Sequence, residues 1–310
     1  MRILVTGGTG FLGQYVVKRL EKLQKNDVIV FSRNRKGKGS FVLGNITDID
    51  ALEKAFPADI VIHLAASFGD SDPDIYSTNV TGTRNVAELC KKYKTKQLIF
   101  MSSTAAIGET KFAEESSERK PKTRYERSKR DAEDVVTNSG LNYTIIRAPV
   151  ILGPSSMWLD VARAAKKKFP LIGRGDNRFH LAYVEDVAEL ICKSAGNKKA
   201  FGQTFHAATR DAPTYKEFYK MLCDALGTEM TKKSVPVFAV KTFSALHETS
   251  SWLKGKNPKP IFSRSSINRL TRDRVVSIKK AKKLLGFTPK HNTKKAIEAT
   301  IKYFKKANMI

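Results

Sequence analysis

The residues best suited to chemistry are a tyrosine and a lysine in the segment YERSK, Tyr125 and Lys129. Positions i and i+4 share one face of a helix, so the two side chains would lie one turn apart. A lysine ammonium at that separation favours the phenolate and lowers the pKa of the tyrosine from its usual value of about 10. Such a pair could exchange a proton with a hydroxyl or carbonyl group. The same spacing also occurs on solvated helix faces, so the rest of the chain must decide between the two interpretations.

A second motif is the glycine-rich segment VTGGTGFLGQ, which places Gly7, Gly10 and Gly13 between an apolar run and an amphipathic stretch. In such a strand–turn–helix unit the first glycine permits a tight turn. The second lets the backbone approach a pyrophosphate, and the third lets helix and strand pack closely. The helix N-terminus then faces the phosphate charge. The motif predicts a dinucleotide-binding turn, with a purely structural glycine turn as the alternative.

The end of the second apolar run bears on the choice of dinucleotide. An acidic residue at this point holds the 2′-hydroxyl of NAD, whereas an arginine suits the 2′-phosphate of NADP. The segment VIVFSRNRKGKG has Ser32 at the acidic position, followed by Arg33, Arg35 and Lys36. We therefore expect NADP, with NAD as the second choice. A basic surface loop would explain the same residues.

Apolar runs alternate with amphipathic stretches through the first part of the chain. Val- and Ile-rich runs predict strands buried on both faces, and their alternation with helices predicts βαβ units. The predicted strands are residues 2–7, 27–32, 59–66, 97–103, 143–153 and 204–208, and the predicted helices are 11–24, 48–55, 74–92, 124–139 and 183–195. The fold class is therefore α/β, a doubly wound parallel sheet of the Rossmann type.

The C-terminal part predicts a smaller, helix-rich lobe. Its first helix should begin with a capping box of Thr214 and Glu217 and end at Gly227, and Ser277 is a plausible N-cap further along. The predicted helices are 213–227, 235–255, 277–289 and 293–307. We expect two domains: residues 1–154 and 181–208 bind the dinucleotide, and residues 155–180 and 209–310 form the substrate-binding lobe.

The composition is that of a folded and strongly basic protein. The chain has 310 residues, 41% of them hydrophobic, and a formal net charge of +26. From Gly227 onward, 20 Lys and Arg residues stand against 4 Asp and Glu residues. Such an excess attracts anions, but the lysines are dispersed and lack the interleaved aromatic residues that stack bases. We therefore expect a solvated basic face and no nucleic acid; contact of residues 235–255 with a membrane surface is left open.

The three cysteines, Cys90, Cys192 and Cys223, lie in helix-like patterns without disulfide or metal-ligand spacing. We expect them to be free, buried thiols, and we expect no metal site. No apolar run approaches the ~20 residues that span a bilayer. The first predicted strand begins at Arg2, with no preceding signal peptide. These features favour a cytoplasmic protein.

The motifs in their order resemble those of the extended short-chain dehydrogenases/reductases over most of the chain. The matching segments are TGGTGFLG (6–13) for the glycine turn, HLAA (63–66), NVTGT (79–83), FMSSTAAIG (100–108) for the strand that bears the hydroxyl, YERSK (125–129), and RAPVILGP (147–154) beside the cofactor. The resemblance implies an NAD(P)-dependent oxidoreductase that moves hydride between nicotinamide C4 and a secondary alcohol or ketone.

The resemblance also implies the roles of individual residues. Tyr125 would donate or accept the proton, Lys129 would hold the ribose hydroxyls and lower the tyrosine pKa, and Ser103 would bind the substrate oxygen. Ser102 or Thr104 is the alternative to Ser103, which could instead satisfy backbone groups. The cofactor contacts would be Gly7, Gly10, Phe11, Leu12, Gly13, Ser32, Arg33, Asn45, Ile46, Leu64, Ala65, Ala66, Asn79, Met101, Tyr125, Lys129, Ala148, Pro149 and Val150.

Departures from the family pattern bear on the substrate. Sugar-nucleotide epimerases and dehydratases carry an arginine that grips the nucleotide diphosphate. Phe179 takes its place in GRGDNRFHLAYVEDVA, although Arg174 or Arg178 could substitute. The G-x-G-x-N stretch in that segment, together with SIKKAKKLLGFTP (277–289), is more similar to the 3β-hydroxysteroid dehydrogenase and dihydroflavonol reductase branch.

Four aromatic residues of the lobe, Trp158, Phe238, Phe243 and Trp252, could offer surface to an apolar substrate, with packing inside the lobe as the alternative. Two other functions stay open: an NDP-sugar epimerase, dehydratase or reductase, and a non-catalytic NADP-binding protein. The resemblance further implies a homodimer in which the helices predicted at 74–92 and 124–139 pair across a twofold axis.

Overall fold

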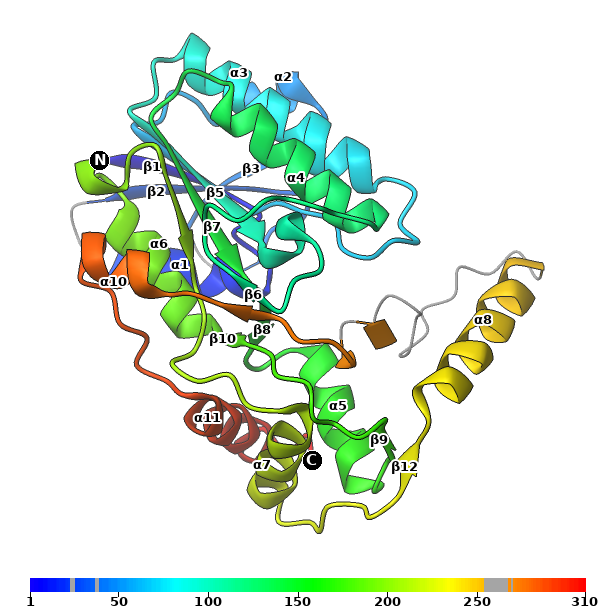
Figure 1. The fold of residues 1–310 in the computed structure, drawn as a ribbon. Helices are drawn as coiled ribbons and strands as arrows, with labels where there is room; N and C mark the ends of the chain where they lie inside the picture. The colour runs from blue at the N-terminus through cyan, green and yellow to red at the C-terminus, as the bar shows by residue number, and fades with distance from the viewer. Residues whose placement is uncertain (23–25, 37–38, 254–266, 269) are drawn as a thin grey trace.

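The computed structural model describes residues 1–22, 26–36, 39–253, 267–268 and 270–310. Its centre is a seven-stranded sheet in the order β11-β7-β5-β4-β1-β2-β3, in which every neighbouring pair is parallel (Figure 1). The predicted α/β class with a doubly wound parallel sheet is confirmed. The strands are β1 (Arg2–Thr6), β2 (Asp27–Ser32), β3 (Ser40–Leu43), β4 (Ile60–His63), β5 (Gln97–Ser103), β7 (Tyr143–Ala148) and β11 (Gln203–His206).

Helices cover both faces of this sheet, as buried Val- and Ile-rich strands require. On one face α1 (Phe11–Glu21) packs against α6 (Val184–Ser194). On the other face α3 (Gly82–Lys92) lies between α2 (Ile49–Glu53) and α4 (Arg124–Thr137) (Figure 1). The outward positions of α3 and α4 are largely charged, and the homodimer through these helices stays a prediction.

Strand boundaries agree with the sequence pattern for β2 and β5. β1 ends at residue 6 instead of 7, β4 covers only 60–63 of the predicted 59–66, and β11 runs over 203–206 instead of 204–208. Two further differences concern whole strands. The run predicted as one strand, 143–153, divides into β7 and β8 (Val150–Leu152), since Pro149 has no N–H to continue the ladder. Strand β3 was not predicted: it is a short edge strand of four residues, with neither terminal residue buried, so it lacks the apolar run that marks the others.

Outside the central sheet, the described residues form further helices and three two-stranded parallel pairs, and the division into two domains stays a prediction. The helix α7 (Tyr215–Leu226) packs against α5 (Ser156–Lys166) and α11 (Thr293–Lys306). The strand pairs are β8 with β10 (Leu181–Tyr183), β9 (Leu171–Ile172) with β12 (Ser234–Val235), and β6 (Phe112–Ala113) with β13 (Val275–Val276). The other elements are α8 (Val237–Leu253), α10 (Lys279–Leu285), the π-helix η1 (Ser77–Thr81) and the 3-10 turns η2 (Thr104–Ile107) and η3 (Lys198–Ala200).

Helix ends follow the sequence signals at both ends of α7, but in α10 only at the C-terminal end, where Gly286 is the C-cap with φ 59°. The capping box of Thr214 and Glu217 is present, and Gly227 adopts the left-handed conformation with φ 72°. The prediction of Ser277 as an N-cap was wrong, because α10 begins after Ile278. The hydroxyl of Ser277 lies 3.4 Å from the backbone N of Lys279, so it satisfies an amide beside the cap position.

The cysteines are free thiols. Cys90 and Cys223 are buried, but Cys192 is only partly so, because α6 approaches solvent where Glu189 pairs with Arg19. Burial raises the pKa of the Cys90 and Cys192 thiols to about 12. Among the described residues, no helix is both long enough and apolar enough to cross a membrane, and no cluster of three or more His, Cys, Asp or Glu is arranged to hold a metal.

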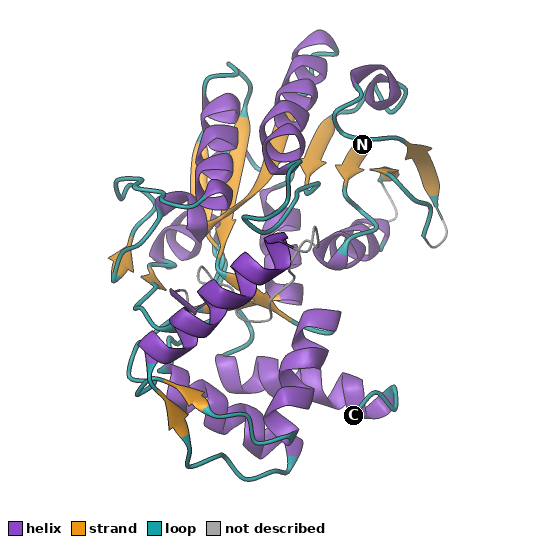
Figure 2. Ribbon diagram, turned by 90° about the vertical axis from the view of Figure 1, so that its right-hand side faces the viewer, coloured by secondary structure: helices purple, strands orange, loops and turns teal. Residues whose placement is uncertain are grey.

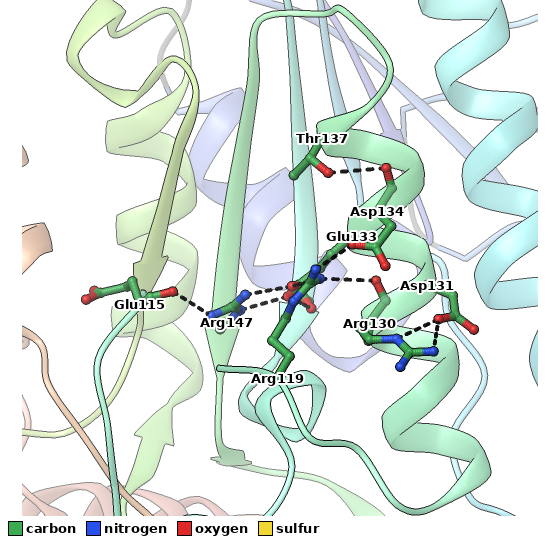
Figure 3. A network of polar contacts seen from close by, with 9 residues as sticks. Glu115, Arg119, Arg130, Asp131, Glu133, Asp134, Thr137 and Arg147 are labelled. Carbon is green, nitrogen blue, oxygen red and sulfur yellow. Dashed lines mark hydrogen bonds and ion pairs between the residues drawn. The ribbon is translucent and has the colours of Figure 1, made fainter. Parts of the chain in front are cut away.

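A buried ion pair attaches α4 to the sheet (Figure 3). The guanidinium of Arg147 on β7 donates from Nε and Nη2 to the two carboxylate oxygens of Glu133, at 2.8 and 2.7 Å. The side chains of the pair are only 6% and 1% exposed. The same carboxylate accepts hydrogen bonds from Ser102 on β5 at 2.5 Å and from Arg119 at 3.4 Å. Two strands and one loop therefore hold the helix that carries YERSK.

Candidate active site

The glycine turn between β1 and α1 has the geometry that the sequence predicted. Gly7 has φ +70°, and a Cβ there would lie 2.7 Å from the backbone N of Ala65. A Cβ on Gly13 would lie 2.3 Å from the carbonyl oxygen of Gly7. Both positions therefore exclude a side chain: the first where β4 ends, and the second where helix and turn pack.

The N-terminus of α1 suits a phosphate group. Gly10 is the N-cap and has no side chain to satisfy the first amides, and the first turn, which begins with Phe11 and Leu12, contains no acidic residue. The orphan N–H groups of such a turn and the helix dipole together bind anions. The structure thus fits a dinucleotide pyrophosphate at Gly10 through Gly13.

The lysine of the YERSK segment lies inside the protein, directly beneath the end of β5. Lys129 is 3% exposed; its Nζ donates to the carbonyl oxygen of Met101 at 2.9 Å and lies 4.6 Å from the centre of the Phe100 ring. Burial lowers the pKa of Lys129 to about 8, while Glu133, one turn further along α4, opposes the shift. An ammonium kept in so dry a place needs anionic or hydroxyl partners, which ribose hydroxyls and a tyrosinate would supply.

Tyr125 stands at the start of α4, one turn before Lys129. Its backbone N donates to a carboxylate oxygen of Asp70 at 2.8 Å, and its ring lies 6.0 Å from that of Phe68, measured between centroids. The capping box of Thr123 and Glu126 fixes this helix end. The side chain is half-buried, so the phenol is anchored by the helix while a face of it can meet a substrate.

At the end of β5 the structure distinguishes Ser103 from its neighbour Ser102. The Oγ of Ser102 is buried and bonds to Glu133, on the α4 side of the sheet. Ser103 points to the opposite face and is half-buried; its Oγ donates to the carbonyl of Ala148 at 3.3 Å and accepts from the N–H of Ala105 at 3.1 Å. Ser103 therefore satisfies backbone groups here, as its alternative interpretation expected, at the edge of the sheet where Met101 receives Lys129.

These features match a known family along the chain. A profile of the NAD dependent epimerase/dehydratase family matches residues 3–207. The chain belongs to that family of extended short-chain dehydrogenases/reductases. It is 29% identical to isoform 1 of the 3beta-hydroxysteroid-dehydrogenase/decarboxylase of Arabidopsis thaliana, over 97% of this chain and 79% of that protein. It is 30% identical to the decarboxylating sterol-4-alpha-carboxylate 3-dehydrogenase of Saccharomyces cerevisiae, over 96% of each.

A solved structure shares the fold. The UDP-glucose 4-epimerase of Thermotoga maritima, determined with UDP-glucose, aligns with a TM-score of 0.78 at 23% identity and covers 99% of this chain and 100% of that one. The likeness establishes the architecture of the family. With the family profile it makes this protein an NAD(P)-binding member with the Rossmann sheet at its centre.

In this family member, a buried chain of polar groups links the glycine turn to the catalytic helix. The N–H of Ala65 donates to Oγ1 of Thr6, which lies 2.6 Å from Nδ1 of His63, and Nε2 of His63 lies 3.0 Å from Oγ1 of Thr83. Since the Thr83 hydroxyl donates to the carbonyl of Asn79, the proton of His63 must be on Nε2. Burial, together with the nearby Lys129 charge, lowers the pKa of His63 to about 3, so the imidazole is neutral.

Asn79 continues this chain to α4. Its Nδ2 donates to the carbonyl of Ser67 at 3.1 Å and to Oγ of Ser128 at 3.0 Å, and its Oδ1 accepts from the N–H of Ser67 at 2.8 Å. Asn79 lies in the π-helix η1, a conformation frequent at functional sites. The predicted cofactor residue Asn79 therefore braces the loop that follows β4 against the YERSK helix.

The remaining predicted cofactor residues follow the carboxyl ends of the strands. After β4, against the glycine turn, lie Leu64, Ala65 and Ala66. Around the ends of β5 and β7 lie Met101, Ala148, Pro149 and Val150, and the last two residues, Asn45 and Ile46, follow β3. Ile46 is buried after β3; its carbonyl accepts from Nδ2 of Asn85, and a Cβ on Gly82 would lie 2.7 Å from it. Asn45 is bound to its own turn through the N–H of Thr47 at 3.3 Å.

The end of β2 presents the predicted basic residues to solvent. Ser32 is buried and its Oγ donates to the carbonyl of Asn34 at 2.8 Å, whereas Arg33 and Arg35 are exposed. Asp72 has a lowered pKa, caused first by a hydrogen bond from Ser67 and also by the charge of Arg33. Arg33 is thus close enough to feel a carboxylate from the loop after β4.

Several functional residues escaped sequence reasoning. Asp70 holds the N-terminus of the catalytic helix, Glu133 anchors the same helix to the sheet, and Thr83 completes the histidine chain. Glu133 lies one turn beyond Lys129, so a search for charged residues at i+4 could have found it. Asp70 sits in a loop far away in sequence and carries no such signal.

One prediction follows from the burial of Lys129. The folded protein binds this proton with a pKa of about 8 and the unfolded chain at about 10.5, so wild-type stability should rise as pH increases through that interval. Between pH 8 and pH 10.5, the free energy of unfolding of the wild type should rise relative to that of Lys129→Met by up to roughly 3 kcal/mol. Urea denaturation without cofactor at a series of pH values measures the difference.

Lys92 provides a control of opposite sign. Its hydrogen bond to Glu53 raises its pKa, so the stability that this lysine contributes is lost, not gained, at high pH. A pH-independent difference between wild type and Lys129→Met would contradict the assignment of a buried, weakly basic ammonium.

Proposed function

We propose that this protein is an NADP-preferring oxidoreductase that interconverts a secondary alcohol and a ketone on an apolar substrate. The observation that carries the proposal is the placement of Lys129: a buried ammonium one helical turn from Tyr125, bonded at the strand end that bears Ser103. Burying a lysine costs free energy unless its charge is used. A protein that only bound the dinucleotide would have no need of this arrangement, which counts against the non-catalytic alternative.

The three residues divide the remaining work of the reaction. Hydride transfer to and from the carbinol carbon is the chemistry that NADP would supply when bound. Ser103 donates a hydrogen bond to the substrate oxygen, and Tyr125 as the phenolate takes the hydroxyl proton onto Oη. Lys129 binds the ribose hydroxyls and stabilises the phenolate by its charge. In ketone reduction the same proton returns from Tyr125 to the oxygen.

The surroundings of Phe179 favour an apolar substrate over a nucleotide sugar. The Phe179 ring is partly buried and lies 5.6 Å from the ring of Phe218 and 6.4 Å from that of Tyr215, so it packs against other aromatic residues of the lobe. Arg174 is 92% exposed and paired with Asp176, while Arg178 donates to the carbonyl of Ala212 and lies near Glu217. Neither arginine occupies the place of a diphosphate ligand.

Two of the relatives point the same way, while another, the UDP-glucose 4-epimerase of Vibrio cholerae, is 27% identical over 99% of this chain. Both sterol enzymes of Arabidopsis and yeast are named for oxidation at a sterol 3-hydroxyl, and they match nearly the whole of this chain. A sterol or another rigid apolar secondary alcohol is therefore the substrate class that we propose. Trp158 does not serve it, since its ring packs in the core against Phe218 and its Nε1 donates to Ile151. The side chain of Trp252 lies outside the described part of the structure.

The first prediction concerns the proton donor. Tyr125→Phe keeps the ring and removes one oxygen, so ketone reduction should fall by ~10²–10⁴-fold while NADPH affinity barely changes. A panel of ketones, sterol ketones among them, identifies a working substrate first; stopped-flow oxidation of NADPH then measures turnover. The matched control is Tyr143→Phe. Tyr143 is the first residue of β7, at the end of the strand away from the candidate site, so this variant should retain full activity. Wild-type turnover in Tyr125→Phe would remove Tyr125 from the reaction.

The second prediction concerns the choice of cofactor. Arg33→Ala should weaken NADPH binding by roughly 10-fold or more, the worth of a charge-assisted contact, and leave NADH binding nearly unchanged. Fluorescence titration with each nucleotide gives the two affinities. Arg84→Ala, an exposed arginine on α3, removes the same charge elsewhere and should change neither. Equal losses for NADPH and NADH would refute the assignment of Arg33 to the 2′-phosphate.

The third prediction separates the nucleotide-sugar alternative. Because Phe179 packs against Phe218, and Arg174 and Arg178 are engaged by Asp176 and by Ala212 and Glu217, UDP-glucose should bind weakly. A thermal shift assay in the presence of NADP should show stabilisation by NADP and no further stabilisation by UDP-glucose. A large additional shift with the nucleotide sugar would favour an epimerase or reductase acting on that substrate.

A further inference from the structure

The helix α8 extends away from the body of the lobe and carries exposed aromatic side chains. Figure 1 shows it leaving β12 on the right of the molecule, and Figure 2, turned to face that side, shows it crossing the near surface. Phe238 is 73% exposed and Phe243 is 70% exposed. A helix of a water-soluble domain normally turns such residues toward the core, so this exposure indicates an interaction surface.

The two exposed aromatic residues of α8 lie on different sides of the helix. Phe238 and Phe243 are five positions apart, which separates them by roughly 140° around a helix of 3.6 residues per turn. The segment VFAVKTFSALHETSSWL holds two charged residues, Lys241 and Glu248, in its 17 positions. Such a surface fits a broad apolar phase better than it fits a narrow apolar groove.

Lysines gather where α8 begins. Lys166, Lys167 and Lys168 end α5, and Lys232 and Lys233 precede β12; all five are exposed and are called the lysine cluster below. The pairing of β9 with β12 brings the two groups together, since the N–H of Leu171 donates to the carbonyl of Lys233 at 3.0 Å. The cluster stays cationic although Lys168 is paired with Glu229.

Exposed aromatic residues beside exposed lysines are the pattern that holds a helix in the plane of an anionic membrane. Aromatic side chains enter the boundary between headgroups and acyl chains, and lysines contact the phosphates. With 17 residues α8 is about 25 Å long at 1.5 Å per residue, less than the ~30 Å of a hydrocarbon core, so it would lie on the bilayer and not cross it.

We propose that α8 and the lysine cluster dock this protein on an anionic lipid bilayer. Charge favours an anionic bilayer over a second copy of the chain at this surface. A second copy also has a net charge of +26, and its lysine cluster would repel this one. The inference rests on α8 and its lysines and is independent of the reaction proposed above. Docking would place the lobe against the phase from which a sterol-like substrate enters.

Flotation with phosphatidylcholine vesicles, with and without phosphatidylglycerol, tests the docking of the full-length protein. The wild type should float with the anionic vesicles alone, and salt should weaken the binding. Phe238→Ser combined with Phe243→Ser should abolish flotation, and Lys232→Glu combined with Lys233→Glu should weaken it by roughly 10-fold or more. NADP-induced thermal stabilisation should be unchanged in all variants, which shows that they fold.

Matched controls lie on α11. Tyr303→Ser removes an exposed aromatic residue there, and Lys294→Glu with Lys295→Glu reverses two exposed charges, and both variants should float like the wild type. Three results would overturn the proposal. The first is that the α8 variants still float like the wild type. The second is that the α11 charge variant loses flotation equally, which would show nonspecific attraction, and the third is that the α8 variants have a lower sedimentation mass without loss of flotation, which would assign α8 to contact between copies.

Discussion

The buried ion pair between Glu133 and Arg147 is the constraint on which the geometry of the catalytic residues depends. Two charges removed from water must satisfy each other closely, because either one left alone would cost several kcal/mol. The bidentate geometry leaves little freedom for α4 to slide along β7. Lys129 lies one turn from Glu133, so its Nζ can reach only the end of β5, where the carbonyl of Met101 receives it.

The same pair shapes the electrostatics of the site. The negative charge of Glu133 helps Lys129 keep its proton in a place where burial favours the neutral amine. His63 adds no competing positive charge, because burial, together with the nearby Lys129 charge, lowers its pKa to about 3. Its ring lies between two threonine hydroxyls at 2.6 and 3.0 Å. The interior below the candidate site is thus polar but satisfied, and such a network rigidifies the groups attached to it.

The two parts of the molecule differ in how firmly their residues are held. The dinucleotide-binding part closes seven strands between two helical layers, and its functional groups stand on strand ends and helix starts. The lobe is joined by short strand pairs, and α8 carries aromatic residues outward from it. The proposed transfer of a proton and a hydride would need precision, whereas the proposed surface for a lipid phase would need only area and charge.

The sequence alone determined the alternation of strands and helices, the glycine turn and the Tyr125–Lys129 pair, because each of these depends on neighbours within a few residues along the chain. It also predicted Ser103 and left Ser102 and Thr104 as alternatives. The pleat of β5 turns Ser102 toward Glu133, while the role of Ser103 stays a prediction. The edge strand β3 and the break at Pro149 escaped it, since edge pairing and ladder continuity are properties of the assembled sheet.

Only the tertiary structure could show which distant residues support the site. Asp70 meets the backbone of Tyr125 across 55 positions, and Thr6 meets His63 across 57. Such contacts follow from parallel strands whose carboxyl ends share one edge of the sheet, and they leave no periodic trace in the amino-acid sequence. The burial that lowers the pKa of Lys129 is of the same kind, because it depends on what the fold places around the lysine, while the chain itself specifies only that the lysine is there.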